Sequence, residues 1–163
     1  MEDLVSINNL NIEARTRAGT LKVVNDLSFT IKKSETLCVV GESGCGKSVT
    51  ALSLMSLLPE GILKVSSGDI LFDNTNLAQL SEAELEGIRG NDISMIFQEP
   101  MTSLNPLFTV GEQVSEVIRR HKNLNKEKAW ASAVELLDAV KIPNPDKRAF
   151  DYPFQLSGGQ RQR

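Results

Sequence analysis

Apolar and polar residues alternate in two segments of the first forty residues. One segment runs from Leu10 to Ala14 and the other from Leu27 to Lys32. A period of two is typical of strands in an antiparallel sheet that has one face in water. Between them, Ala18-Gly19-Thr20 carries a turn signal. The pattern therefore predicts antiparallel strands with a turn between them.

A different pattern follows between residues 36 and 59. The segment Thr36–Val40 is continuously apolar, which predicts a strand buried on both faces. A glycine-rich turn comes directly after it. Apolar residues at helical spacing then predict a helix that ends at Pro59, with an apolar face made of Ala51, Leu52, Met55 and Leu58.

Short elements are predicted between residues 68 and 106. Asp69–Asp73 reads as a short strand behind Gly68, and Ile93–Phe97 reads as a second apolar strand. Between them, the spacing Ser81-x-x-Glu84 is that of a capping box, which predicts a short helix. Prolines and an asparagine oppose regular structure from Gln98 to Pro106, so this segment is expected to be a loop.

Two longer helices are predicted in the C-terminal half. A second capping-box spacing, Thr109-x-x-Glu112, precedes a helical stripe of apolar residues. Another helix is expected from about Lys126 to Val140, and Pro143 and Pro145 end it. Its apolar side consists of Trp130, Val134 and Leu137.

Composition and charge limit the possible functions. The 163 residues suffice for one domain with a core, 40% of them are apolar, and the net charge is −3. A protein that holds duplex nucleic acid along one face usually has a basic excess, so nucleic acid is not expected as a partner. The chain has no long apolar run and no secretory signal at its acidic N-terminus, so any membrane role is expected to come through partner proteins. Its two cysteines, Cys38 and Cys45, suggest a reducing cytosol rather than a disulfide framework.

Residues 41–48 carry the strongest chemical signal in the chain. They match the phosphate-binding loop pattern at every fixed position. Glycines let the backbone curl so that successive N–H groups point at phosphate oxygens, and the following helix adds the positive end of its dipole. Lys47 can reach the β and γ phosphates, and the Ser48 hydroxyl can ligate Mg²⁺. The predicted binding residues are Gly41, Glu42, Ser43, Gly44, Cys45, Gly46, Lys47 and Ser48.

Two further motifs lie beyond this loop. Gln98 follows the apolar segment Ile93–Phe97, and Leu156 precedes a glycine-rich run at the end of the chain. In that run a serine hydroxyl and two glycine N–H groups at a helix start can form an anion site. Its residues are Ser157, Gly158, Gly159 and Gln160.

Together with the phosphate loop, these motifs resemble those of the ABC ATPases, and the resemblance spans essentially the whole chain. The segments Ile96–Pro106, Val110–Gln113 and Tyr152-Pro153 are similar to the ATP-binding subunits of dipeptide, oligopeptide, nickel and glutathione importers. The resemblance implies an α/β fold: a P-loop NTPase core with an N-terminal antiparallel β flank and a helical insert, incomplete at the C-terminus. The expected parts are residues 1–98 for the flank and core, 99–155 for the helical subdomain, and 156–163 for the signature motif.

The same resemblance implies the chemistry and the partners. ATP and Mg²⁺ are the expected cofactors, Lys47 and Gln98 are the expected catalytic residues, and Ser48 and Gln98 serve the metal. The signature, Ser157 to Gln160, would act in trans on a nucleotide held by another subunit. The expected partners are permease transmembrane subunits, a second ATP-binding subunit and, indirectly, an extracytoplasmic solute-binding protein. The expected location is peripheral, on the cytoplasmic face of the bacterial inner membrane.

Three features depart from the family pattern. The family stacks adenine on an aromatic residue at a place that falls here on Ala14 or Arg15, and the Arg15 guanidinium could stack in its stead. Ser34 stands where a turn glycine is usual. The chain ends at Arg163, so we expect it to lack the Walker B strand, the D-loop and the switch histidine. We therefore expect a chain that is marginally stable, binds nucleotide weakly and does not turn over ATP.

Several alternatives remain open at this point. An ABC ATPase of DNA repair or of the ribosome is one, although the segment between Ser48 and Ser157, which are 109 positions apart, shows no heptads. A non-catalytic fragment is another.

The thiol of Cys45 either has a lowered pKa or simply fills a small-residue position. The basic cluster from Arg119 to Lys122, which includes His121, suits a helix end, and contact with anionic lipid is its alternative reading.

Overall fold

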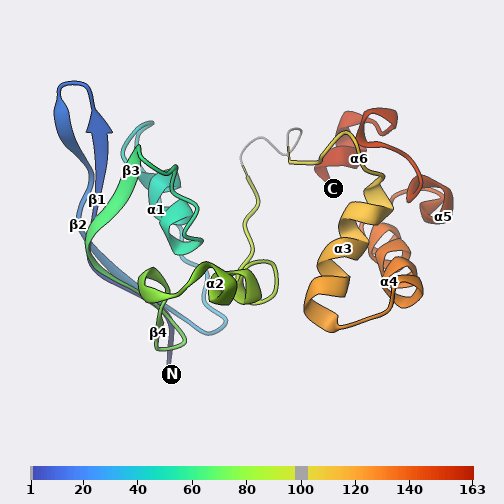
Figure 1. Ribbon diagram of the computed structural model, residues 1–163, viewed down its shortest axis with the longest axis horizontal. Coiled ribbons are helices and arrows are strands. Elements are labelled where there is room, and N and C mark those ends of the chain that lie inside the picture. Colours follow the sequence, from blue (N-terminus) through green and yellow to red (C-terminus); the bar gives the residue numbers. More distant parts are fainter. Residues whose placement is uncertain (1, 98–102) are drawn as a thin grey trace. The chain divides into compact units, whose positions relative to one another are not determined.

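The computed structural model describes residues 2–97 and 103–163. The chain divides into two compact units, Met1–Arg89 and Gly90–Arg163 (Figure 1). Each unit has its own core. None of the helices in the described ranges is both long and apolar enough to cross a membrane.

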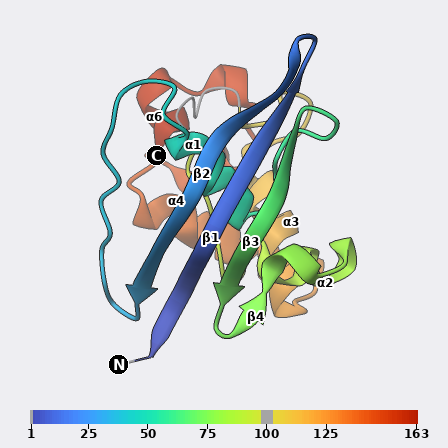
Figure 2. The same ribbon diagram turned by 90° about the vertical axis from the view of Figure 1, so that its left-hand side faces the viewer.

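The first unit is built on a four-stranded sheet in which neighbouring strands run antiparallel. The strands are β1 (Asp3–Thr16), β2 (Gly19–Lys32), β3 (Leu63–Phe72) and β4 (Thr75–Asn76), in the order β2-β1-β3-β4. Figure 2 shows this sheet in front of helix α1 (Lys47–Leu54), so that one face of the sheet is covered. The predicted strands at residues 10–14 and 27–32 are confirmed, and the one predicted at 69–73 forms the end of the longer strand β3, up to Phe72. The predicted turn at 18–20 lies at residues 17–18, and Gly19 and Thr20 already belong to β2.

A bulge in β1 keeps its apolar residues on one side of the sheet. Register shifts occur between Ile7 and Leu10, and both of these side chains are fully buried. Asn9 sits in the bulge with a left-handed φ of 47°, and its side-chain amide donates to Asp26 at 2.8 Å. Side chains in a strand alternate between the two faces of the sheet with a period of two. An extra residue is therefore needed to bring the apolar residues of β1 before and after the bulge to the same face. The core on this face contains Val5, Ile7, Leu10, Ile12, Val24, Ile70 and Leu77.

Helix α1 ends earlier than the sequence predicts. The expected end at Pro59 is wrong, because the helix stops at Leu54. Ser56 takes a left-handed φ of 49°, and the amide of Leu57 donates to the carbonyl of Leu52 at 2.9 Å. The amide of Ser56 donates to Ser53, which completes a Schellman motif. A serine in place of the usual glycine hides this stop signal in the sequence.

Two predicted strands are absent from the described residues. Thr36–Val40 forms no strand and is exposed, with Val40 at 83% of its full exposure. Ile93–Phe97 is likewise not a strand, and Ile96 is 94% exposed. An apolar strand that is buried on both faces needs neighbouring strands to satisfy its backbone, and no described strand pairs with either segment. Both predictions are therefore wrong for the chain as described.

Helix α2 (Glu82–Ile88) begins at the predicted capping box. The amide and hydroxyl of Ser81 donate to the Glu84 carboxylate at 2.8 and 2.6 Å. These hydrogen bonds, that of the hydroxyl foremost, lower the pKa of Glu84 from its usual value. A short 3-10 helix, Leu77–Gln79, precedes it. After α2, the Arg89 guanidinium donates to the carbonyls of Met55 and Ser56 at 2.7 and 3.1 Å, so it ties the end of α1 to α2.

The second unit is helical. It contains α3 (Val110–Lys122), α4 (Lys126–Ala139), the short α5 (Pro145–Arg148) and α6 (Gly158–Gln162), with a 3-10 turn at Pro153–Gln155. The helix predicted behind the capping box at Thr109 and the helix predicted from about Lys126 to Val140 are both confirmed, and Thr109 caps α3 by accepting from the Glu112 amide at 3.3 Å. Trp130 and Val134 pack, as predicted, against a core made of Val110, Leu137, Ile142, Ala149 and Leu156.

We predict that Gly68→Ala destabilises the first unit far more than Gly19→Ala does. Both glycines have left-handed φ angles, 94° and 126°. A Cβ on Gly68 would lie 2.5 Å from the Asn9 carbonyl oxygen, whereas a Cβ on Gly19 meets nothing within 4 Å. We expect a loss of about 3 kcal/mol or more for Gly68→Ala and about 1 kcal/mol for Gly19→Ala in urea unfolding. Equal losses would contradict the bulge packing.

We predict that Leu137→Ala lowers the unfolding free energy of the second unit by about 3 kcal/mol, because it leaves a cavity in the core. Its neighbour Leu136 provides a matched control, because that side chain is 51% exposed and Leu137 only 7%. Leu136→Ala should change the unfolding free energy by less than about 1 kcal/mol. Urea unfolding monitored by Trp130 fluorescence measures both. A reversed order would show that α4 packs through its other face.

Candidate functional site

The predicted phosphate loop lies between an exposed segment and helix α1. Residues 41–45 are exposed, and Gly46 is buried as the N-cap of α1. Gly46 has a left-handed φ of 94°, and a Cβ there would lie 3.0 Å from the Val23 carbonyl oxygen. The loop is thus pressed against β2 at a position where only glycine fits. The Thr50 hydroxyl fixes the first turn of α1 by donating to the Gly46 carbonyl at 3.0 Å.

The side chain of Lys47 folds back across this loop. Its ammonium donates to the carbonyl oxygens of Gly41 and Glu42, each at 2.7 Å, and lies 3.5 Å from the Cys45 sulfur. The Cys45 amide donates to the Glu42 carbonyl at 3.4 Å. Among the described residues, no acceptor pairs with the amides of Gly44 and Gly46. The loop therefore brings together one cation and two backbone donors without acceptors.

This donor set fits a nucleotide phosphate with its magnesium ion. Unpaired amides and an ammonium at the start of a helix are the groups that hold phosphate oxygens. Ser48 is exposed in the first turn of α1, where its hydroxyl offers a hard oxygen ligand. Within the described ranges, no group of three or more His, Cys, Asp or Glu side chains is placed to hold a metal ion.

The two candidate positions for adenine lie on opposite faces of the sheet. Ile12 pairs with Val24, whose Cγ2 would be 3.1 Å from a Cβ on Gly46, so this face is the one toward the loop. By strand alternation, Ala14 lies on the same face as Ile12, and Arg15 lies on the other.

The surroundings of Arg15 agree with this assignment. Arg15 lines a separate cavity of about 280 Å³ with Glu13 and Lys64, which form an ion pair at 3.8 Å. Of the two positions, Ala14 is the one on the face of the phosphate loop. The sequence left this choice open because alternation alone does not say which face the loop covers.

The other predicted site residues belong to the second unit. Gln98 lies outside the described residues. In the signature motif, Ser157 is the N-cap of α6: its hydroxyl accepts from the Gln160 amide at 3.3 Å, and the Gln160 side chain accepts from the Ser157 amide at 2.9 Å. The amides of Gly158 and Gly159 stand in the first turn, where a helix leaves them without internal acceptors.

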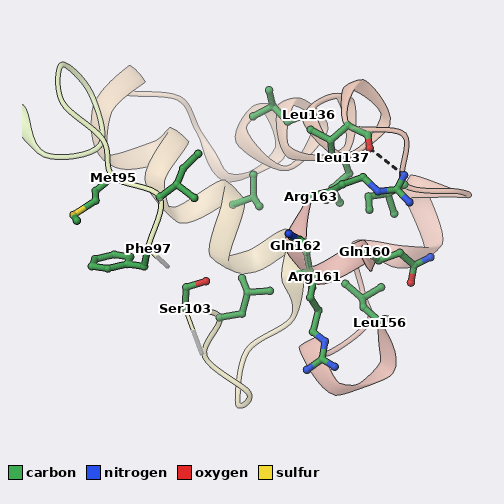
Figure 3. Close-up of a pocket in the computed structure, with 16 residues that line it drawn as sticks. Met95, Phe97, Ser103, Leu136, Leu137, Leu156, Gln160, Arg161, Gln162 and Arg163 are labelled. Atoms are coloured by element: carbon green, nitrogen blue, oxygen red, sulfur yellow. Dashed lines mark hydrogen bonds between the residues drawn. The ribbon is translucent and has the colours of Figure 1, made fainter. Parts of the chain in front are cut away.

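An apolar cavity that the sequence analysis missed lies beside the signature. Figure 3 shows this space of about 380 Å³, lined by Met95, Phe97 and Leu137 among others, and by residues 160–163. The Arg163 guanidinium donates to the Lys141 carbonyl at 2.7 Å, and the buried Nε of Arg161 has no partner among the described residues. The only sequence signal for it was the apolar segment Ile93–Phe97, which was read as a strand.

Comparison with known proteins identifies the same family that these motifs indicate. The family model described as ABC transporter matches residues 24–163. The chain is 51% identical over 163 residues to the dipeptide transport ATP-binding protein DppD of Bacillus subtilis, and it covers 49% of that protein. It is 46% identical to the oligopeptide transport ATP-binding protein OppD of the same organism, and covers 45% of it. It is 47% identical to the glutathione import ATP-binding protein GsiA of Salmonella paratyphi A, and covers 27% of it.

Solved structures show the same relationship. The dimeric structure of MJ0796, a bacterial ABC transporter cassette, matches with a TM-score of 0.80 at 26% identity, covering 96% of this chain and 65% of that one. The same cassette in a post-hydrolysis state with ADP and Pi matches with a TM-score of 0.78. The chain spans about half the length of DppD and OppD. On this evidence, the chain belongs to the ABC transporter family of ATPases, with an α/β P-loop fold.

Proposed function

We propose that this chain binds ATP with Mg²⁺ through residues 41–48, and that within an assembled transporter ATP hydrolysis drives import of peptides or related small solutes. The observation that carries the proposal is the Lys47 ammonium, folded over a loop whose Gly44 and Gly46 amides lack acceptors. The names of the relatives, which are dipeptide, oligopeptide and glutathione transport proteins, support the solute class.

Each site residue has a distinct role in this proposal. The backbone of Gly41, Glu42, Ser43, Gly44, Cys45 and Gly46 surrounds the phosphates, and Lys47 exchanges its carbonyl partners for the β and γ phosphate oxygens. Ser48 and Gln98 hold Mg²⁺, which neutralises phosphate charge, and Gln98 also contacts the attacking water. Ser157, Gly158, Gly159 and Gln160 act in trans on a nucleotide held by a second ATP-binding subunit.

The proposed assembly is peripheral to the cytoplasmic face of a bacterial inner membrane. The segment around Gln98 and the helices of the second unit dock permease subunits, and a solute-binding protein takes part indirectly. We also propose that residues 1–163 alone do not turn over ATP. Their signature acts on another subunit's nucleotide, and the segment 36–40 that leads into the phosphate loop is not held in a sheet.

We predict that Lys47→Ala weakens binding of Mg-ATP by about 10-fold or more, because it removes a charge-assisted contact to phosphate. Equilibrium dialysis with radiolabelled ATP measures this. Lys33→Ala, which removes an exposed lysine in the turn after β2, is the control and should bind as the parent chain does. Equal binding by the two variants would contradict the site. The same preparation should release phosphate only at the background rate.

We predict that Ala14→Phe strengthens ATP binding by about 5-fold or more, because an aromatic ring on the face of the loop can stack on adenine. Arg15→Phe is the matched control and should have no such effect, because position 15 lies on the opposite face of the sheet. Inorganic triphosphate, which has no base, should bind both variants and the parent chain equally. A gain for Arg15→Phe alone would contradict the assignment of the faces.

A further inference from the structure

The connection between α3 and α4 carries a positive charge excess that opposes the charge of the whole chain. Residues 119–128 contain five arginines and lysines and a single carboxylate, that of Glu127, while the chain as a whole has a net charge of −3. The cations are Arg119, Arg120, Lys122, Lys126 and Lys128. We call residues 119–128 the basic tip. Figure 1 shows it at the end of the α3–α4 helix pair.

Most of these cations are exposed and unneutralised. Lys122, Lys126 and Lys128 are exposed, as is Arg119, and none of these four side chains forms an ion pair or hydrogen bond with another described residue. Some basic residues elsewhere are paired with carboxylates: Lys64 pairs with Glu13, and Arg148 pairs with Asp151. The basic tip therefore leaves a concentrated charge available to a partner outside the chain.

Helix stability accounts for only part of the basic tip. Lys122 stands in the last turn of α3, where a cation is favourable to the helix dipole. Lys126 and Lys128 stand in the first turn of α4, behind its N-cap Asn125, where the positive end of the dipole repels them. Their placement costs helix stability, so it needs another explanation.

The surroundings of the basic tip suit a flat anionic surface. An open groove of about 570 Å³ beside the basic tip is lined by Arg119, Lys126, Trp130 and Phe150, and also by the carboxylates of Glu112 and Glu127. The two rings pack at 4.8 Å, and Phe150 is 64% exposed. Aromatic rings beside Lys and Arg are typical of surfaces that meet the headgroup region of a membrane.

The spread of the cations beyond the groove favours a lipid surface over a partner that binds inside the groove. Lys122 and Lys128 are not among the residues that line the groove, so a peptide confined to it would leave their charges uncontacted. An anionic leaflet attracts every cation close to its surface, and each contributes about 1 kcal/mol there without needing to enter the groove.

We propose that the basic tip binds anionic phospholipid headgroups, with Lys126 and Lys128 contributing in spite of their cost to α4. The choice of a lipid partner rests on the proposed function, which puts the chain beside a membrane. The contact itself involves neither the phosphate loop nor nucleotide.

Sedimentation of the full chain with lipid vesicles tests this proposal. Vesicles of phosphatidylcholine containing about one third phosphatidylglycerol should bind the chain, and pure phosphatidylcholine should not. Lys126→Ala combined with Lys128→Ala should weaken binding about 30-fold while the melting temperature stays equal or rises. The control, Lys33→Ala with Lys147→Ala, removes the same charge from exposed positions elsewhere and should bind as the parent chain does.

Three results would overturn the inference. They are equal binding by both double variants, no binding to vesicles that contain phosphatidylglycerol, and binding that requires permease in the vesicle, which would identify an acidic protein segment instead. Dialysis with ATP on the same samples keeps the two proposals apart. A chain that binds ATP and not lipid fails only here, and a chain that binds lipid and not ATP fails only in its proposed function.

Discussion

The alignment of apolar side chains along one face of β1 is the constraint on which the first unit depends. Ile7 and Leu10 are both fully buried although they are three positions apart, and this is possible only because the bulge at Asn9 inserts one residue into the alternation. Gly68 makes room for that bulge on the neighbouring strand. The face so formed supports Val24, and Val24 in turn supports Gly46 at the end of the phosphate loop. The loop geometry therefore follows from a bulge far from it in the sequence.

Elements with local signals could be predicted from the sequence. The capping residues Ser81 and Thr109 start helices as expected, and alternation identified β1 and β2. The segments Thr36–Val40 and Ile93–Phe97 could not be predicted in this way. Their apolar character indicates burial in a larger sheet, but a strand forms only when neighbours pair with its backbone, and that information is not local. The end of α1 was not predicted because Ser56 adopts a left-handed conformation, and glycine is the residue that usually occupies such a position.

The residue types of the phosphate loop were sufficient to locate the candidate site but not to predict its geometry. The spacing of residues 41–48 predicts a curled backbone, but not that Lys47 bonds to the carbonyls of Gly41 and Glu42. Nor could it say on which face of the sheet Ala14 lies, because that depends on where the loop packs. In the second unit, α3 draws on distant residues too: its Val110 and Gly111 amides donate to the carbonyls of Asp151 and Ala149. The helix start is thus completed by a segment some forty residues later in the chain.

The position of the Lys47 ammonium also bears on which anions the loop can accept. A ligand that replaced both carbonyl contacts of this cation would have to offset about 1.5–3 kcal/mol for each charge-assisted bond. A singly charged ion such as chloride gains too little from one new contact to offset both bonds. A polyphosphate, which presents several oxygens to the ammonium and the free amides together, gains enough. By this reasoning, the resting contacts of Lys47 would favour an anion that offers several oxygens over a monovalent ion that offers one contact.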